Sequence, residues 1–244
     1  MTKPIVKYII GTDALKKKDR YARKGVHGLK DYAAGKPWKM EKQQRILETA
    51  YALFSEKGIN PVTITDIAEA SGVGRATLFR YFPSKLELVI AIGTWKWEEY
   101  IDWHNTLLPP EKMETITGAE WLRFFLDAFL DLYRNHADIL RFNYNFNSYL
   151  RYEAGDTEQR QPYLRMTDGL GELFHQLYER GKADGTLNTE YSEQAMLSSA
   201  FHIMLAAVTR YAVGLVVVYE NSSQPESELV MLAEMLLARF TRRK

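Results

Sequence analysis

The chain has 244 residues, 46% of them hydrophobic and 26% charged, a balance typical of a globular protein with a sizeable core. Cysteine is absent, so disulfides, thiolate metal sites and cysteine nucleophiles are excluded, and a reducing, cytoplasmic location is expected. No apolar run approaches the ~18 residues of a membrane span, and the apolar stretch at residues 8–10 is too short for a signal peptide.

Charge is unevenly distributed along the chain. Residues 1–40 contain 11 Lys and Arg against 3 Asp, a net +8, so the remaining residues carry −7 of the total +1. This extension is rich in glycine and lysine, and only residues 12–24 are predicted to include a short helix. A basic extension before an acidic body suggests an anionic partner, such as a nucleic-acid backbone, and a solvated leader is the alternative.

The first strongly periodic segment follows at residues 41–57. Its apolar residues recur with the spacing of one helical face, at Ile46, Ala50, Leu53 and Phe54. Gly58 is a candidate for the C-terminal cap, because glycine adopts the left-handed conformation without strain from a Cβ atom. Asn60 and Pro61 then indicate a loop.

Residues 62–88 predict two short helices joined by a tight turn, which is a helix-turn-helix pattern. The first helix begins at Thr63, which has the spacing of a capping box with Asp66. The second spans residues 75–82 and ends there because Pro83 follows. Its exposed face can enter the major groove of DNA while the first helix supports it. The packing positions are Ala68, Val73, Leu78 and Phe82.

A second capping box, Ser84 with Glu87, opens a long helix over residues 85–107. Further amphipathic helices are predicted at residues 118–135, 137–153, 160–183, 190–219 and 225–242. The expected fold is all-α, with a three-helix, helix-turn-helix head and a larger C-terminal helical domain. The predicted domains are a basic extension at 1–40, a DNA-binding domain at 41–88, and a ligand-binding and dimerisation domain at 89–244.

The residues that carry a family resemblance are Ile46, Ala50, Phe54, Gly58, Thr63, Ile64, Asp66, Ile67, Ala68, Gly72, Val73, Leu78, Phe79, Tyr81, Phe82, Ser84, Lys85 and Leu88. In this order and spacing, they resemble the tetracycline-repressor (TetR) family of helix-turn-helix transcriptional regulators. The resemblance covers residues 41–90. It implies an all-helical homodimer, an operator with two half-sites, and a ligand pocket in the C-terminal domain.

The resemblance also implies which residues contact DNA, and these are Thr63, Arg75, Ala76, Thr77, Phe79, Arg80, Tyr81 and Lys85. Arg75 would hold a guanine through two hydrogen bonds, and Ala76 would either allow a close approach to the DNA or meet a thymine methyl group. The others would contact bases or phosphates. Two departures from the family leave the base contacts open: Gly74 stands where a capping Ser or Thr is frequent, and Phe79 where a tyrosine is common.

Aromatic residues are concentrated between residues 95 and 178, and such a helical domain can line an apolar cavity that holds a few polar anchors. The alternative is that these residues only fill the core. The residues predicted to bind a small, mainly apolar effector are Trp103, Trp121, Phe125, Phe129, Phe142, Tyr144, Asn147, Phe174, Tyr178, His202 and Arg210. No cofactor or metal is expected.

The last two predicted helices carry apolar stripes that suit a four-helix bundle across a two-fold axis. The predicted dimer residues are Met204, Met231, Met235, Leu236 and Phe240. An operator with two half-sites requires a two-fold protein, so the expected partners are double-stranded DNA and a second copy of the chain.

The expected function is a ligand-responsive repressor in which the effector tilts the helix predicted at residues 85–107. A transcriptional activator, or a helical adaptor without an effector, is the alternative. An enzyme is not expected, because the sequence has no Gly-rich phosphate loop and no histidines at metal-ligand spacing.

Overall fold

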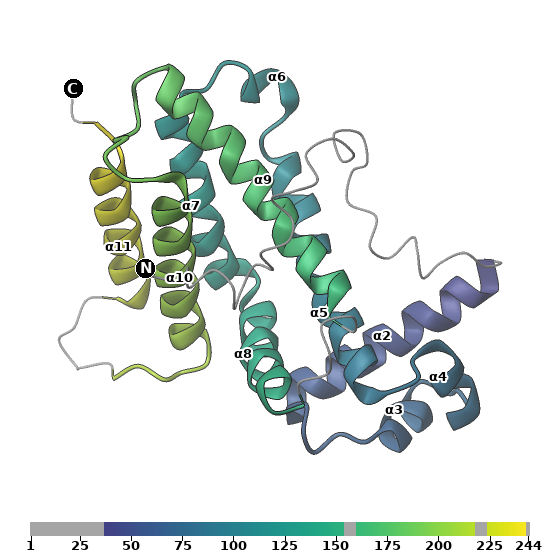
Figure 1. The fold of residues 1–244 in the computed structure, drawn as a ribbon. Helices are drawn as coiled ribbons and strands as arrows, with labels where there is room; N and C mark the ends of the chain where they lie inside the picture. The colour runs from purple at the N-terminus through teal and green to yellow at the C-terminus, as the bar shows by residue number, and fades with distance from the viewer. Residues whose placement is uncertain (1–36, 154–159, 218–223, 243–244) are drawn as a thin grey trace, which may run out of the picture. The chain divides into compact units, whose positions relative to one another are not determined.

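A computed structural model of the chain describes residues 37–153, 160–217 and 224–242 (Figure 1). Its helices are α2 (Pro37–Lys57), α3 (Ile64–Ala70), α4 (Arg75–Tyr81), α5 (Lys85–Thr106), α6 (Pro110–Met113), α7 (Gly118–Asn135), α8 (Ala137–Tyr152), α9 (Gln161–Ala183), α10 (Glu193–Ala212) and α11 (Pro225–Phe240). Within these ranges no strand forms, and the all-α prediction is confirmed. None of the described helices is long and apolar enough to cross a membrane.

The chain divides into two compact units. The first comprises residues up to Glu99 together with Ser148–Leu170, and the second comprises Tyr100–Asn147 together with the residues from Gly171 onward. By these limits, α5, α8 and α9 each contribute residues to both units.

In the first unit, α2 packs against α3, and α3 packs against α4. The apolar face predicted for α2 is confirmed, since Ile46, Ala50 and Phe54 are fully buried. Gly58 ends the helix as expected, with a φ of 81° and its N–H donating to the carbonyl of Phe54 at 2.9 Å. The helix begins at Pro37, a few residues inside the predicted extension, where proline suits the first turn.

In the second unit, α7, α10 and α11 pack against one another side by side (Figure 1). A capping box of Thr117 and Glu120 starts α7. Gly118 lies so close to Gly181 of α9 that a Cβ atom on Gly118 would be 2.1 Å from the Cα atom of Gly181. This crossing therefore requires glycine at position 118, whereas a Cβ atom on Gly181 would lie 2.2 Å from Cγ of Leu187.

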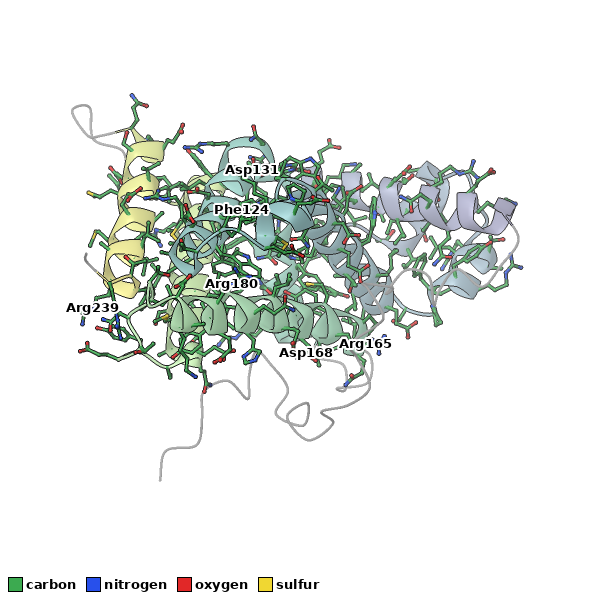
Figure 2. All side chains as sticks on the ribbon, turned by 90° about the horizontal axis from the view of Figure 1, so that it is seen from above. Phe124, Asp131, Arg165, Asp168, Arg180 and Arg239 are labelled. Atoms are coloured by element: carbon green, nitrogen blue, oxygen red, sulfur yellow. The ribbon has the colours of Figure 1, made fainter. Side chains whose placement is uncertain are left out.

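The α6–α7 loop is held to α9 by Arg180, one of the residues labelled in Figure 2. Its Nη1 group donates to the carbonyl of Glu114 at 2.9 Å. This contact helps to fix the start of α7, the helix that packs against both α10 and α11.

The sequence prediction was wrong at one helix end. The helix predicted over residues 190–219 ends at Ala212, because Gly214 follows with a φ of 73°, a left-handed conformation that breaks the helix. The short helix α6 was not predicted. The helix predicted at residues 12–24 lies outside the described residues.

Candidate nucleic-acid interface

The start of α3 is closed by the predicted capping box. The backbone N–H of Asp66 donates to Oγ1 of Thr63 at 3.1 Å, and the backbone N–H of Thr63 donates to Oδ2 of Asp66 at 2.7 Å. These hydrogen bonds, first from the Thr63 backbone and then from its hydroxyl, hold the pKa of Asp66 below its usual value. The Thr63 hydroxyl is thus already engaged within the protein.

A tight turn joins α3 to α4. Gly72 has a φ of 66°, which favours glycine, and the N–H of Val73 donates to the carbonyl of Ala68 at 3.0 Å. The buried hydroxyl of Ser71 donates to the carbonyl of Ile67 at 2.6 Å, so it is satisfied by its own helix. Hydrogen bonds within the turn and the left-handed backbone of Gly72 therefore hold its conformation. This conformation sets the angle between α3 and α4.

The inner face of α4 is pinned by apolar residues. Leu78 is completely buried and Phe82, just after the helix, is nearly so. Ala68 of α3 is also buried, as predicted for a helix crossing that needs a small residue. At the N-cap of α4, Gly74 supplies no side-chain hydrogen bond.

The outer face of α4 carries the predicted base-reading residues. Arg75, Ala76, Phe79 and Arg80 are all exposed and lie on one stripe of the helix, and Thr77 is half-buried beside them. Phe79 is 41% exposed, which is unusual for a phenylalanine. In the described part of the chain, no carboxylate forms an ion pair with Arg75 or Arg80, so both guanidinium groups can pair with an anion.

Tyr81 and Lys85, which were expected to contact phosphates, do not extend into solvent. The hydroxyl of Tyr81 is buried and has no hydrogen-bond partner among the described residues. Lys85, the first residue of α5, donates from Nζ to the carbonyl of Asn60 at 3.1 Å, and its ammonium lies 5.6 Å from the ring centroid of Tyr149. Burial lowers the pKa of this lysine below its ordinary value. Both side chains are thus directed into the protein.

The predicted effector residues fall into separate groups. Phe125 lies between Phe129 and Phe174, with ring centroids 5.5 and 5.2 Å away, and Phe129 also meets Phe201, which was not predicted, at 5.8 Å. These four form the aromatic cluster, built from α7, α9 and α10.

The other predicted effector residues lie elsewhere. Trp121 and Phe142 are buried, and Phe142 is stacked on Phe146. The Tyr178 hydroxyl donates to the carbonyl of Tyr191 at 3.0 Å. The exposed members are Trp103, Tyr144, Asn147, His202 and Arg210.

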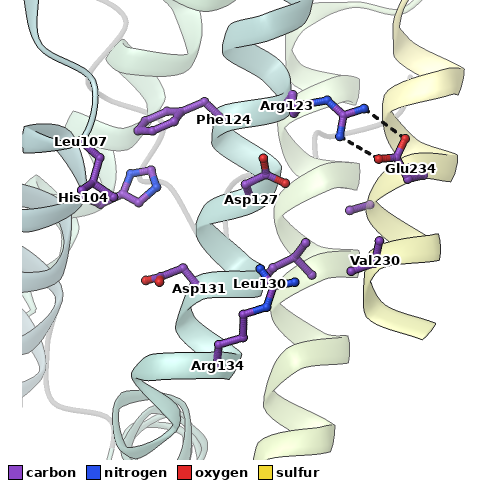
Figure 3. A pocket seen from close by; sticks show the side chains of 11 residues that line it. His104, Leu107, Arg123, Phe124, Asp127, Leu130, Asp131, Arg134, Val230 and Glu234 are labelled. Carbon is purple, nitrogen blue, oxygen red and sulfur yellow. Dashed lines mark hydrogen bonds and ion pairs between the residues drawn. The ribbon is translucent and has the colours of Figure 1, made fainter. Parts of the chain in front are cut away.

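The second unit contains an open pocket of about 360 Å³ (Figure 3). It is lined by His104 of α5 and Leu107 just after that helix, by Arg123, Phe124, Asp127, Leu130, Asp131 and Arg134 of α7, and by Val230, Ala233 and Glu234 of α11. None of the predicted effector residues lines it. The aromatic residues do not point to this charged face of α7, which the regular spacing of Arg123, Asp127 and Asp131 could have indicated.

The predicted dimer residues also separate. Met204, Leu236 and Phe240 are buried within their own chain, whereas Met231 and Met235 are 59% and 62% exposed. The two exposed methionines are one helical turn apart on α11. They therefore share one face of that helix.

Comparison with known proteins links the head of this chain to one family. Residues 46–92 match the family model described as bacterial regulatory proteins of the tetR family. An HTH-type transcriptional regulator of Staphylococcus aureus (strain MRSA252) is 26% identical over 159 residues, covering 65% of this chain and 77% of that protein. The HTH-type transcriptional regulator CymR of Pseudomonas putida is 32% identical over 92 residues, covering 38% of this chain and 45% of that protein.

Solved structures show the same fold over most of the chain. The fatty acid degradation regulator FadR from Bacillus halodurans superposes with a TM-score of 0.61 at 19% identity, covering 83% of this chain and 96% of that one. A transcriptional regulator from Saccharomonospora viridis in complex with choline has a TM-score of 0.64 at 19% identity, covering 84% and 100%. At these identities the likeness concerns the fold alone.

Proposed function

We propose that this chain, a TetR-family helix-turn-helix transcriptional regulator, acts in the cytoplasm as a homodimeric repressor that a small effector releases from its operator. The observation that carries the DNA-binding part is the outer face of α4. Two guanidinium groups that form no ion pair with any described residue flank an exposed phenylalanine on this short helix, and buried Leu78 and Phe82 fix its inner side. This is the arrangement of a recognition helix that enters a major groove.

Base reading on this proposal rests mainly on Arg75, with Ala76, Thr77, Phe79 and Arg80 around it. An arginine can donate two hydrogen bonds to one guanine, which discriminates against a wrong base by about 1–3 kcal/mol. The exposed ring of Phe79 would meet a thymine methyl group or a sugar. Because the hydroxyl of Tyr81 and the amine of Lys85 are directed inward, they would reach phosphates only after a local rearrangement.

The dimer would form through the faces of α10 and α11 that do not pack on α7. On α11 this face carries Met231 and Met235, and on α10 it carries the exposed residues His202, Ile203, Ala206 and Arg210. Flexible methionines beside small residues allow two helix pairs to pack closely across a two-fold axis. Two heads related by that axis would read half-sites about 34 Å apart, or a multiple of that distance.

The effector would act through α5, because this helix begins directly after the helix-turn-helix and ends in the second unit. The aromatic cluster of Phe125, Phe129, Phe174 and Phe201 supports a mainly apolar effector in that unit. The solved structure of FadR from Bacillus subtilis with stearoyl-CoA is a precedent on this fold. A coupling of about 1–3 kcal/mol would change operator occupancy about 5–150-fold.

The test is selection of bound sequences from a random pool of duplex DNA by the full-length protein at moderate salt. A two-fold symmetric site with helically phased half-sites should be enriched. Arg75→Ala should relax the preference at one position of each half-site, whereas Arg165→Ala, which removes an exposed arginine from α9, should leave the preference unchanged. Enrichment of no sequence by a folded protein would reject DNA reading and favour an adaptor.

A second measurement decides whether the protein represses or activates transcription. Transcription in vitro from a promoter that contains the selected site should fall when the protein is added. A rise in transcription would identify an activator instead.

A further inference from the structure

The pocket between α5, α7 and α11 has a charge pattern that selects among ligands. Four charged residues follow one stripe of α7 at its floor: Arg123, Asp127, Asp131 and Arg134 (Figure 3). The two arginines stand at the ends of the stripe, and the two aspartates stand between them. The order of charges along the helix is therefore positive, negative, negative, positive.

Both arginines are already neutralised by glutamates of α11. Arg123 binds Glu234 through two hydrogen bonds of 2.7 and 3.2 Å, and Arg134 binds Glu226 at 2.7 Å. A guanidinium that is paired in this way gains little from a second carboxylate. An anionic ligand would have to break one of these pairs, so the pocket disfavours anions.

The aspartates are not neutralised in the same manner. Asp127 forms neither a hydrogen bond nor an ion pair within the described ranges of the chain, and partial burial raises its pKa against the lowering effect of Arg123 and Arg134. Asp131 accepts hydrogen bonds from the amide of Asn135 at 2.7 Å and from the hydroxyl of Tyr100 at 3.3 Å, and its Oδ2 lies 3.6 Å from Nε2 of His136, a group that is charged only when protonated.

The balance of charge is negative. With Glu226 and Glu234 counted beside the floor residues, two arginines face four carboxylates, a net −2. His104 does not offset this charge at neutral pH, because burial lowers its pKa. The pocket thus attracts a positive group and places it next to an unpaired carboxylate.

The wall formed by α5 is apolar and aromatic. The imidazole of His104 lies against the ring of Phe124 with centroids 4.3 Å apart, and Leu107 is half-exposed beside them. Leu130 completes this surface from the floor. Phe124 and Asp127 are three residues apart on α7, so they are neighbours on its surface. An aromatic ring beside a carboxylate suits an organic cation, because the ring attracts the positive charge and the apolar body covers the wall.

We propose that this pocket binds an organic ammonium ion with a small apolar or aromatic body, with Asp127 as the counter-ion and Phe124, Leu107 and Leu130 as the apolar contacts. The site is distinct from the aromatic cluster, which shares none of its lining residues. It is also distinct from the proposed dimer face, since it uses Val230, Ala233 and Glu234 of α11 rather than Met231 and Met235.

The proposal is tested by titration calorimetry of the full-length protein with three probes of one shape: 2-phenylethylammonium, 2-phenylethanol and phenylacetate. Only the ammonium ion should bind. Asp127→Asn should weaken its binding by about two- to fivefold, as expected for a partly exposed ion pair. Asp102→Asn, which makes the same change at an exposed residue of α5 outside the pocket, should leave the affinity unchanged.

The place of binding is checked by NMR. The ammonium probe should shift the imidazole signal of His104, which lines the pocket, and should leave that of His175, which does not. Leu107→Ala removes a half-exposed side chain from the wall and should also weaken binding. Equal binding of the neutral probe, full affinity in Asp127→Asn, or a shift confined to other residues would overturn the proposal. Because no DNA is used, failure of DNA reading would not alter these outcomes.

Discussion

The ammonium group of Lys85 donates a hydrogen bond to the backbone carbonyl of Asn60, and this 3.1 Å contact joins the first residue of α5 to the loop between α2 and α3. The same ammonium lies over the ring of Tyr149. The family resemblance implies that this lysine contacts a phosphate of DNA. In the structure it instead links α5 to the α2–α3 loop, which is a stabilising role within the protein. The two roles have different consequences and can be separated by experiment.

We predict that Lys85→Ala destabilises the protein by about 1 kcal/mol, because it removes a charge-assisted hydrogen bond from a half-buried site. The slope of log affinity for DNA against log salt should stay the same, whereas Arg80→Ala should reduce it by about one. Thermal unfolding and DNA binding at several salt concentrations measure the two effects. A lower slope in Lys85→Ala with unchanged stability would support the phosphate contact instead.

Two glycines in the turn between α3 and α4 should respond in opposite directions to serine. Gly74 is the N-cap of α4 with a φ of −70° and open space around a Cβ atom, so Gly74→Ser should stabilise the protein by about 0.5–1 kcal/mol through a new cap and a less flexible unfolded chain. Gly72 has a φ of 66°, so Gly72→Ser should cost about 1–2 kcal/mol. Urea unfolding curves measure the change in the free energy of unfolding for both variants. Equal changes would contradict the expectation that a side chain at position 72 strains the backbone.

The dimer face can be tested by placing charge on α11. On the proposed dimer, the unchanged protein should have the mass of two chains and Met235→Glu that of one, because two carboxylates would meet near the two-fold axis. Glu190→Gln changes an exposed residue before α10 and serves as the control. Light scattering after size exclusion gives the mass directly. A Met235→Glu protein that remains dimeric would place the interface elsewhere.

Two histidines should titrate on opposite sides of the ordinary value. Burial lowers the pKa of His104, partly opposed by Asp131, whereas the hydrogen bond with Glu193 raises the pKa of His175. NMR titration of the imidazole signals should therefore show His175 titrating at the higher pH. The reverse order would contradict the burial of His104.

These shifts also set how stability depends on pH. The folded state binds a proton at His104 less readily than the unfolded state, so stability falls as the pH drops below about 6.5, the unfolded pKa. The contribution of His175 has the opposite sign: it is present below the unfolded pKa and is lost as the pH rises through the folded pKa. It should be the smaller of the two, because His175 is half-exposed and its ion pair is screened by solvent.

The role of the basic extension is a hypothesis from charge alone, since residues 1–36 lie outside the described ranges. If it follows the DNA backbone, deletion of residues 1–36, which stops just before α2, should flatten the salt dependence of DNA binding. Replacement of Lys16, Lys17 and Lys18 by glutamine should give part of the same effect. An unchanged slope in both variants would leave the extension without a role in DNA binding.

Local signals in the sequence were sufficient to predict where the helices of the helix-turn-helix region begin and end. A capping box needs only Thr63 and Asp66, and a left-handed C-cap needs only Gly58, because these interactions join residues a few positions apart. The same reasoning failed at the end of α10, because residues 215–217 continue the helical pattern of the sequence whereas the helix ends at Ala212. The sequence contains the glycine at position 214, but it does not specify that the residue adopts a positive φ.

The sequence alone thus established the class of fold and the two short helices of the helix-turn-helix, because periodicity and capping are local. Only the tertiary structure decided which side of each helix meets the chain's own core. Met204 and Met231 have the same chemistry, yet one is buried on α10 and the other exposed on α11. It also decided that Asp127 and Phe124 share a pocket with His104 of another helix. Such pairings depend on how helices distant in sequence pack, and no local pattern encodes that geometry.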